Sequence, residues 1–291
     1  MEPQKDRLAY VIGNDQYDEH KPLFGCLNDA ENIGISLNKC GFVVKKFHNL
    51  DFKTFSAAVD SFKRECAFYN VGLFYFAGHG FEHDGNNYLC PTDTDMLFEN
   101  ISQNNINITN LIAEISRNRD FVSIVILDCC RVAFKQKSRS ANDAEKINDI
   151  SPNFKNAGGA FVAYATTSGA VANENNGKGI YTQAICKHIE TVGLTIESLF
   201  KNVRRNVIAQ AGSKQIPWEY SSLMDDFYFI RPKHTLTINE IVERAITEAW
   251  SYEMLKANVS SYLPKNNTTD NYEEVMFDIL TSIDSGGNNN E

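Results

Sequence analysis

Two short segments contain residues whose types could carry out nucleophilic chemistry. The first is AGHG at 77–80 and the second is DCCR at 128–131. Each follows an apolar run typical of a buried strand. Because the carboxyl ends of neighbouring strands meet at one edge of an open α/β sheet, we expect His79 and Cys130 to face each other there. An imidazole in that position can act as general base and acid, and a thiolate can act as nucleophile.

The residues beside this pair bear on its geometry. Gly78 and Gly80 let the backbone turn sharply around His79 and approach a substrate closely. Cys129 precedes Cys130, and strand alternation directs its side chain to the opposite face, toward the core. A shift of the strand by one residue would make Cys129 the nucleophile, so this alternative stays open. A buried cysteine can also be no more than a small apolar residue.

A metal site is another interpretation of the histidines. His79, Glu82 and His83 match the H-x-x-E-H pattern of the inverzincins, in which two histidines one helical turn apart bind zinc. The flanking glycines disfavour a helix, and the DGN sequence at 84–86 is typical of a turn. We therefore expect no metal here and place His83 in a loop near the cleft.

The elements that must position these residues alternate between strand and helix patterns over the first 230 residues. This alternation predicts a mainly parallel, six-stranded sheet with helices on its faces. Strands are expected at 8–13, 42–47, 71–76, 123–127, 160–166 and 223–230. Helices are expected at 28–40, 109–118, 180–188 and 196–211, with a further one that Asp51 caps and that runs to Cys66.

The pattern changes beyond Pro232. Thr237 and Glu240 form a capping box for one helix that runs to about Leu255, and a second helix is expected near 272–280. We therefore predict a domain at 1–232 and a helical appendage at 233–291. The appendage could regulate the domain by binding a partner, a small molecule or a second copy, or it could serve stability alone.

Composition restricts the class of protein further. The 291 residues are 43% hydrophobic and 22% charged, which indicates a globular chain. The net charge is −9 without basic clusters, so nucleic acid and anionic membrane are not expected as partners. No apolar stretch could span a bilayer and no secretory signal is recognisable, which predicts a cytoplasmic protein. Seven cysteines without C-x-x-C spacing favour free thiols.

The two segments resemble the catalytic segments of clan CD cysteine peptidases, in particular the paracaspases of peptidase family C14. LFYFAGHG and SIVILDCCR contain the histidine and the cysteine, whose separation of 51 residues matches the roughly 50 typical of caspases. The resemblance extends over about 7–231 through LAYVIGNDQY, CLNDAENI, YLCPTDT, FVAYATTSGAVANE and KQIPWEYSSLMDDFYF. It implies a caspase-like three-layer α/β sandwich and an endopeptidase that uses a Cys–His dyad without a cofactor.

The resemblance also implies the roles of individual residues. His79 becomes the base and acid, Cys130 the nucleophile, and the Gly80 amide contributes to the oxyanion hole. A caspase fold that binds partners without turnover is the alternative. The resemblance further implies a homodimer through the last strand, expected at 223–230.

An acidic S1 pocket for the substrate's Arg or Lys side chain is implied at Asp29, Asp128 and Glu174. Several carboxylate oxygens suit a guanidinium, which one of them can bind in a bidentate manner. Each residue also has a simpler interpretation: the first turn of a helix for Asp29, a cap after a strand for Asp128, and a solvated loop for Glu174.

The segment 132–157 is polar and charged, which predicts a long loop. An enzyme directed at Arg and Lys could cleave itself there, or the loop could stay intact. The candidate sites for such self-cleavage are Lys135, Lys137, Arg139 and Lys146.

Overall fold

The chain divides into two compact units, Met1–Ile230 and Arg231–Glu291. In the first unit and the two residues after it, the computed structural model describes residues 5–17, 22–83, 85–94, 103–118, 121–129, 132–133, 159–166, 174–175, 178–212 and 215–232. In the second it further describes residues 245, 251, 254–255, 276 and 280–281.

A six-stranded sheet forms the centre of the first unit. The strand order is β12-β9-β7-β3-β1-β2, and every neighbouring pair is parallel except β12 with β9. This confirms the predicted mainly parallel sheet. Its strands are β1 (Lys5–Gly13), β2 (Val43–His48), β3 (Tyr69–Gly78), β7 (Val122–Cys129), β9 (Ala160–Tyr164) and β12 (Trp218–Ser221).

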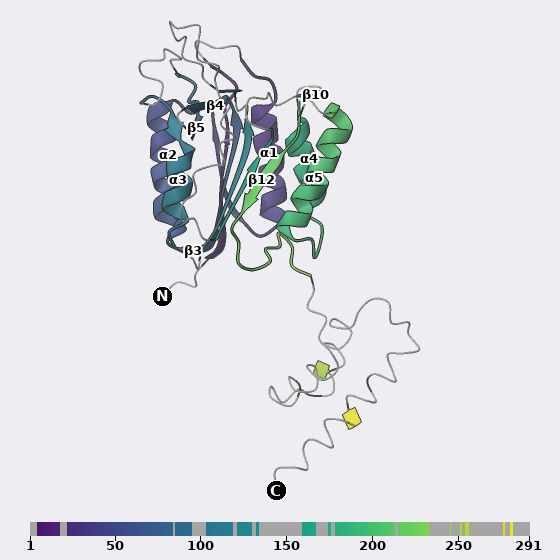
Figure 1. Cartoon of the computed structure of the whole chain (residues 1–291). Helices are drawn as coiled ribbons and strands as arrows, with labels where there is room; N and C mark the ends of the chain where they lie inside the picture. The colour runs from purple at the N-terminus through teal and green to yellow at the C-terminus, as the bar shows by residue number, and fades with distance from the viewer. Residues whose placement is uncertain are drawn as a thin grey trace, which may run out of the picture. The chain divides into compact units, whose positions relative to one another are not determined.

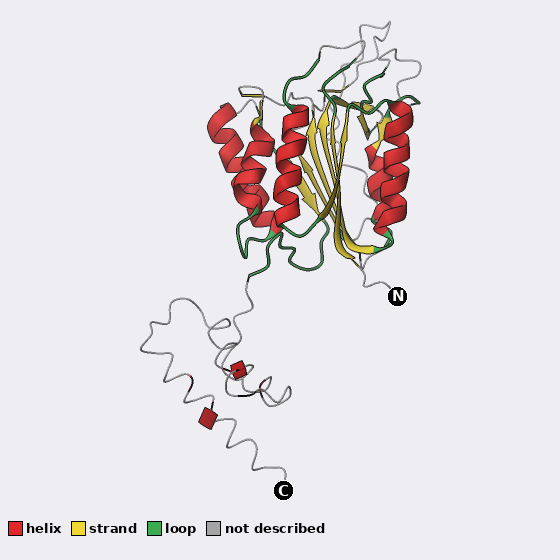
Figure 2. Cartoon of the chain, turned by 180° about the vertical axis from the view of Figure 1, so that it is seen from behind, coloured by secondary structure: helices red, strands yellow, loops and turns green. Residues whose placement is uncertain are grey.

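Helices cover both faces of this sheet (Figures 1 and 2). One layer contains α1 (Cys26–Lys39), α4 (Ile180–Ile189) and α5 (Ile196–Ala211), and the other contains α2 (Phe52–Cys66) and α3 (Ile108–Ile115).

Successive side chains of the central strands pack into opposite layers, because alternate residues of a strand point to opposite faces. In β3, Tyr75 joins the core with α1 and α4, whereas Phe74 and Phe76 join the core with α2 and α3. Asp51 caps α2 as predicted, since its side chain accepts a hydrogen bond from the Thr54 N–H at 2.8 Å.

The last strand of the sheet differs from the prediction. It is β12 at Trp218–Ser221, and within 223–230 only Tyr228 and Ile230 form isolated bridges. Phe227 and Phe229 are buried in the core with α5. Their alternation with polar residues reflects burial of one side of an irregular segment, which mimics the pattern of a paired strand.

A second, four-stranded sheet was not expected from the sequence. Its order is β6-β5-β4-β8, from strands at Ile106–Asn107, Asn86–Leu89, Gly80–His83 and Val132–Ala133. Strands of two to four residues are too short to show a periodic pattern. His83 is therefore the last residue of a strand and not a loop residue. The predicted loop 132–157 begins with β8, and residues 134–157 lie outside the described ranges.

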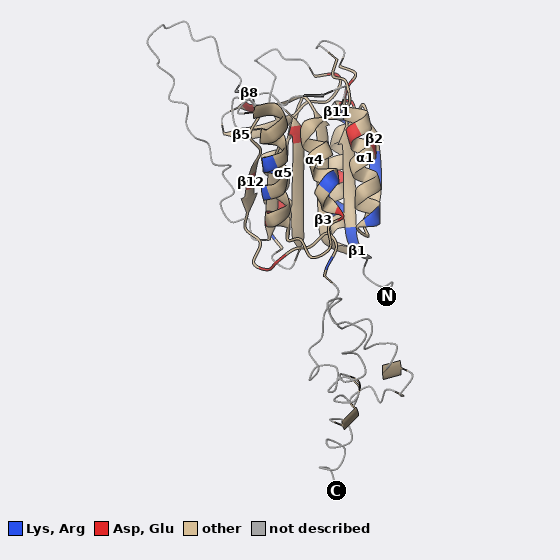
Figure 3. Ribbon diagram, turned by 90° about the vertical axis from the view of Figure 1, so that its right-hand side faces the viewer, with Lys and Arg blue, Asp and Glu red and all other residues tan. Residues whose placement is uncertain are grey.

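The helices predicted at 237–255 and 272–280 fall almost entirely outside the described residues. Residues 245, 254–255, 276 and 280–281 are helical. In the described parts of both units, no helix is long and apolar enough to cross a membrane. Lys and Arg are interspersed with Asp and Glu over the layer of α1, α4 and α5 (Figure 3).

Candidate active site

The predicted catalytic segments follow the two central strands of the large sheet. In the register of β3 with β7, Gly78 lies opposite Cys129. Neighbouring strands are about 4.8 Å apart. The residue before His79 and the residue before Cys130 are thus neighbours at the carboxyl edge of the sheet. Cys130 itself lies outside the described residues.

The glycines beside His79 are required by close packing. A Cβ atom on Gly78 would lie 2.5 Å from the Tyr17 hydroxyl oxygen, and one on Gly80 would lie 2.8 Å from Cys129 Sγ. Neither glycine has a positive φ. Steric fit therefore accounts for both glycines better than the sharp turns inferred from the sequence, because a Cβ atom at either position would collide with a neighbouring side chain.

Cys129 is buried in the core beneath α2 and α3, with 5% of its surface exposed. This confirms the predicted direction of its side chain. Asp128, one residue earlier, lies at the other face, where Thr182 of α4 contacts it. The strand alternates as expected up to its last residue.

Tyr17 contacts His79 in two ways that the sequence did not indicate. The His79 backbone N–H donates a hydrogen bond to the Tyr17 hydroxyl oxygen at 2.7 Å, and the centres of the two rings are 4.5 Å apart. Burial raises the pKa of the Tyr17 hydroxyl well above its ordinary value, with the neighbouring Cys90 thiol adding to the effect. The hydroxyl therefore keeps its proton at neutral pH.

Asn14 links the segments around His79. Its buried side-chain amide donates to the carbonyl oxygens of Leu50 at 3.3 Å and Cys90 at 3.2 Å, and its oxygen accepts from the Leu50 N–H at 2.9 Å. The Cys90 N–H in turn donates to the His79 carbonyl oxygen at 2.9 Å. Asn14 thus holds the end of β5 against the end of β1, beside the histidine.

The structure brings two of the predicted pocket carboxylates together. Asp29, buried in the first turn of α1, accepts the Gly179 N–H at 2.8 Å on Oδ2. Asp128 near the end of β7 accepts the Thr182 hydroxyl at 2.7 Å, also on Oδ2. A Cβ atom on Gly179 would lie 2.6 Å from the first oxygen and 2.8 Å from the second. Both oxygens therefore border one small space.

The backbone of Glu174 reaches the same place. A short hairpin of β10 (Glu174–Asn175) and β11 (Lys178–Gly179) pairs Glu174 with Gly179, immediately before α4. The Glu174 side chain lies outside what the structure describes. The three predicted pocket positions come from three distant parts of the chain and gather around Gly179.

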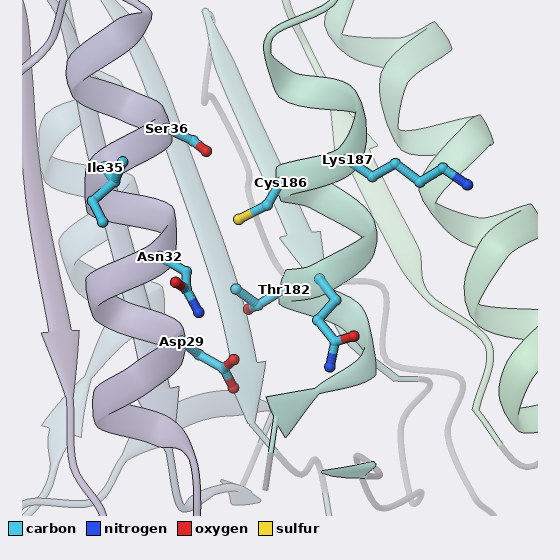
Figure 4. Close-up of a pocket in the computed structure, with 8 residues that line it drawn as sticks. Asp29, Asn32, Ile35, Ser36, Thr182, Cys186 and Lys187 are labelled. Atoms are coloured by element: carbon cyan, nitrogen blue, oxygen red, sulfur yellow. The ribbon is translucent and has the colours of Figure 1, made fainter. Parts of the chain in front are cut away.

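A pocket of about 500 Å³ extends between α1 and α4 from this point. Asp29 and Thr182 project toward the space between the two helices from opposite sides (Figure 4). Cys186 also lines the pocket, and burial raises the pKa of its thiol to about 11. Cys186 is therefore overwhelmingly protonated at neutral pH and a poor nucleophile.

The H-x-x-E-H residues do not form the helix that an inverzincin site needs. His79 precedes β4, and Glu82 and His83 lie on that strand. In the ranges that the structure describes, no group of three or more His, Cys, Asp or Glu side chains could hold a metal ion.

A six-stranded sheet between two helical layers, with histidine and cysteine segments at the ends of its central strands, defines a caspase-like domain. The chain belongs to the caspase domain family, peptidase C14, whose family model matches residues 6–228. This confirms the resemblance seen in the sequence. The family assignment includes Cys130 within its matched range, although the structure does not describe that residue.

Curated relatives match parts of the chain. The human mucosa-associated lymphoid tissue lymphoma translocation protein 1 is 28% identical over 186 residues, which are 64% of this chain and 21% of that protein. The paracaspase of Dictyostelium discoideum is 29% identical over 138 residues, 44% of this chain and 31% of that protein. The alignments thus span less than a third of these relatives' own length.

Among solved structures, caspase-1 from Spodoptera frugiperda has the same fold. It superposes with a TM-score of 0.60 at 18% sequence identity, covering 80% of this chain and 93% of that one. At this identity the likeness shows the shared fold alone.

Proposed function

We propose that this caspase-family domain is a cysteine endopeptidase with a dyad of His79 and Cys130. The Cys130 thiolate attacks the scissile carbonyl carbon, and His79 gives a proton to the leaving amine. Water then hydrolyses the acyl-enzyme with His79 as base. The Gly80 N–H donates to the oxyanion. The observation that carries this proposal is the register of the central strands, which sets Gly78 beside Cys129.

We further propose that the enzyme cleaves after Arg, and less well after Lys. The support is the pair of carboxylate oxygens of Asp29 and Asp128, which border the same space at Gly179. Carboxylate oxygens that border one space offer several acceptors to a cationic side chain. Glu174 contributes a third carboxylate in this proposal.

The test compares two variants, each with one cysteine replaced, on fluorogenic peptides that end in Arg, Lys, Asp or Leu. Cys130→Ala is expected to abolish cleavage of the Arg peptide, whereas Cys129→Ala removes a buried thiol and is expected to keep most activity. A reversed result would make Cys129 the nucleophile. If the wild type cleaves no peptide and a thiol-directed Arg-peptide inhibitor leaves Cys130 unlabelled, the alternative of a silent binding module is correct.

Peptide preference separates the pocket proposal from the dyad proposal. Asp128→Asn keeps the shape of the side chain and removes its charge, so it is expected to weaken cleavage after Arg while Cys130 still reacts with iodoacetamide. Unchanged preference for Arg in this variant would contradict the acidic pocket.

We also propose a homodimer formed through the sheet edge. Of the two edge strands, we choose β12, where Trp218 is 58% exposed and Tyr220 is 37% exposed. An exposed edge strand can pair with a second copy. Sedimentation at increasing protein concentration tests this, and a constant monomer mass would refute it.

We also propose how the activity is controlled. Residues 233–291 regulate it by binding a partner or a small molecule. The enzyme cleaves itself after one or more of the basic residues at 135, 137, 139 and 146. Mass spectrometry of the purified protein tests self-cleavage, with Cys130→Ala as the control in which the fragments must be absent.

A further inference from the structure

We propose that Thr182 is a positioning residue for substrate specificity, because its hydroxyl fixes the carboxylate of Asp128 in the orientation that binds a guanidinium. This inference rests on the proposed Arg pocket and deepens it. The role was not visible in the sequence.

Thr182 joins two other elements through two hydrogen bonds, one buried and one partly buried. Its Oγ1 lies 2.7 Å from Asp128 Oδ2 at the end of β7 and 2.6 Å from the Tyr75 hydroxyl oxygen on β3. Thr182 is 1% exposed and Tyr75 is fully buried. The three residues thus form one chain of hydrogen bonds across the layer between the sheet and α4.

The chemistry of the groups fixes the direction of this chain. An ionised carboxylate only accepts hydrogen bonds, so Thr182 must donate its single hydroxyl proton to Asp128. The Thr182 oxygen then accepts from Tyr75. Burial, together with the charges of Asp128 and Asp29, raises the pKa of Tyr75 well above its ordinary value. Tyr75 therefore keeps its proton at neutral pH and can donate it to Thr182.

A hydroxyl donor suits a site for a cationic side chain. It restrains rotation of the Asp128 carboxylate and, unlike an ammonium group, adds no positive charge of its own beside it. A lysine partner in the same place would neutralise part of the carboxylate's charge. The Thr182 contact thus orients the carboxylate without placing a cation beside it.

This arrangement favours arginine over lysine as the bound side chain. A guanidinium is planar and binds a carboxylate through two parallel hydrogen bonds, which require the carboxylate plane to be oriented. An ammonium group behaves as a point charge and tolerates a rotated carboxylate. Loss of the Thr182 hydroxyl should therefore weaken Arg binding more than Lys binding.

The test uses Thr182→Val, which has nearly the same shape without the hydroxyl, and Thr182→Ser, which keeps the hydroxyl. For Thr182→Val we expect kcat/KM on the Arg peptide to fall about tenfold, mainly through KM, and on the Lys peptide only about twofold. Thr182→Ser should restore the ratio of the two substrates. The rate of Cys130 alkylation by iodoacetamide should stay unchanged in both.

Binding without turnover gives a second measurement. In the Cys130→Ala protein, calorimetry with an Arg peptide is expected to show weaker affinity once Thr182→Val is added. This arm works even if the wild type cleaves nothing, in which case the proposed peptidase activity fails and the Thr182 proposal is still decided. Tyr75→Phe removes the hydroxyl at the far end of the hydrogen-bond chain and should weaken Arg binding about twofold. This variant keeps the proposal testable if Thr182→Val does not fold.

Two results would overturn the proposal. Equal losses for Arg and Lys peptides, with slower alkylation of Cys130, would show that Thr182 only supports the fold of α4. Unchanged Arg affinity in both Thr182→Val and Tyr75→Phe would show that the hydrogen-bond chain does not position Asp128.

Discussion

His79 is held by Tyr17 at two points, its backbone N–H and its ring. The contact also explains why residue 78 must be glycine, since a Cβ atom there would collide with the Tyr17 hydroxyl. The orientation of the imidazole therefore depends on a residue 62 positions away in the chain. In a dyad enzyme this orientation matters for proton transfer and much less for substrate binding.

Tyr17→Phe is accordingly expected to lower kcat about fivefold with little change in KM, because one hydrogen bond of about 1 kcal/mol is lost while the ring contact stays. Tyr17→Leu also removes the ring and should lower kcat further. Steady-state kinetics on the Arg peptide measure both effects. Tyr228→Phe is the matched control, since that hydroxyl bonds only the surface residue Asp226 in the described structure at 3.0 Å. Equal kinetics for Tyr17→Phe and Tyr228→Phe would contradict the prediction.

Sequence reasoning found candidate residues at this scale when their chemical type was informative. It is easy to recognise a histidine between two glycines, or a cysteine that follows an apolar strand. The resemblance to a known family also pointed to particular carboxylates. Tyr17 and Thr182 are chemically ordinary, and their contacts to His79 and Asp128 span 62 and 54 residues. Such roles follow from packing between distant segments, which no local pattern records.

At the scale of elements, Glu65 fastens the edge strand β2 to α2. Its carboxylate accepts hydrogen bonds from Lys45 Nζ at 2.6 and 2.7 Å, from Tyr10 at 2.9 Å and from Ser61 at 3.2 Å. Burial raises the pKa of Glu65, but these hydrogen bonds outweigh it, and the net pKa lies below the usual value. The ionised form therefore stabilises the fold.

Glu65→Gln should lower the free energy of unfolding by about 1 kcal/mol at pH 7, since the site is partly exposed. Because the folded pKa is depressed, this contribution is complete above the unfolded pKa of about 4.3 and is lost as pH falls through the folded value. Urea unfolding measures this effect: the difference in the free energy of unfolding between variant and wild type should be smaller near pH 3 than at pH 7.

Glu114→Gln is the control for this measurement. Glu114 pairs with Lys63 at 2.8 Å on the surface, where it is 43% exposed. Its replacement should change stability little at either pH. A difference between Glu65→Gln and wild type that persists undiminished at pH 3 would show that the carboxylate charge is not the source of the stabilisation.

The sequence predicted long elements well and short ones poorly. The central strands β3 and β7 are buried on both faces and read as continuous apolar runs, so their places were clear. β4, β5 and β8 have two to four residues and left no pattern, although β4 begins directly after His79. The segment 223–230 gave a strand-like pattern because Phe227 and Phe229 are buried without pairing.

At the scale of the whole molecule, the first unit is closed by contacts between its two ends. The guanidinium of Arg7 on β1 donates to the carbonyl oxygens of Phe229 at 2.6 Å and Tyr228 at 3.0 Å. It also lies over the rings of Phe42 and Phe227, at 5.5 and 5.2 Å from their centres. The sheet, its helical layers and the two apolar cores on its faces are built within residues 5–230.

A chain that ends at residue 232 is therefore expected to fold cooperatively, with a thermal transition close to that of the same unit in the full chain. A chain that ends at residue 222 loses Phe227 and Phe229, and Arg7 keeps only one of its three carbonyl partners, Cys40 at 3.1 Å. Removing two buried phenylalanines should cost several kcal/mol, about 3–5 for each. Circular dichroism melts of the two truncated proteins measure the difference.

The same truncation tests the role of residues 233–291, because a folded 1–232 protein can be assayed on the Arg peptide. A change in kcat/KM relative to the full chain, with an unchanged melt, would support regulation by the removed segment. Equal activity would assign that segment no role in control. If the 1–232 protein is unfolded while the full chain is folded, the first unit needs residues beyond 232 for stability, and the closure of the fold by Arg7 is insufficient.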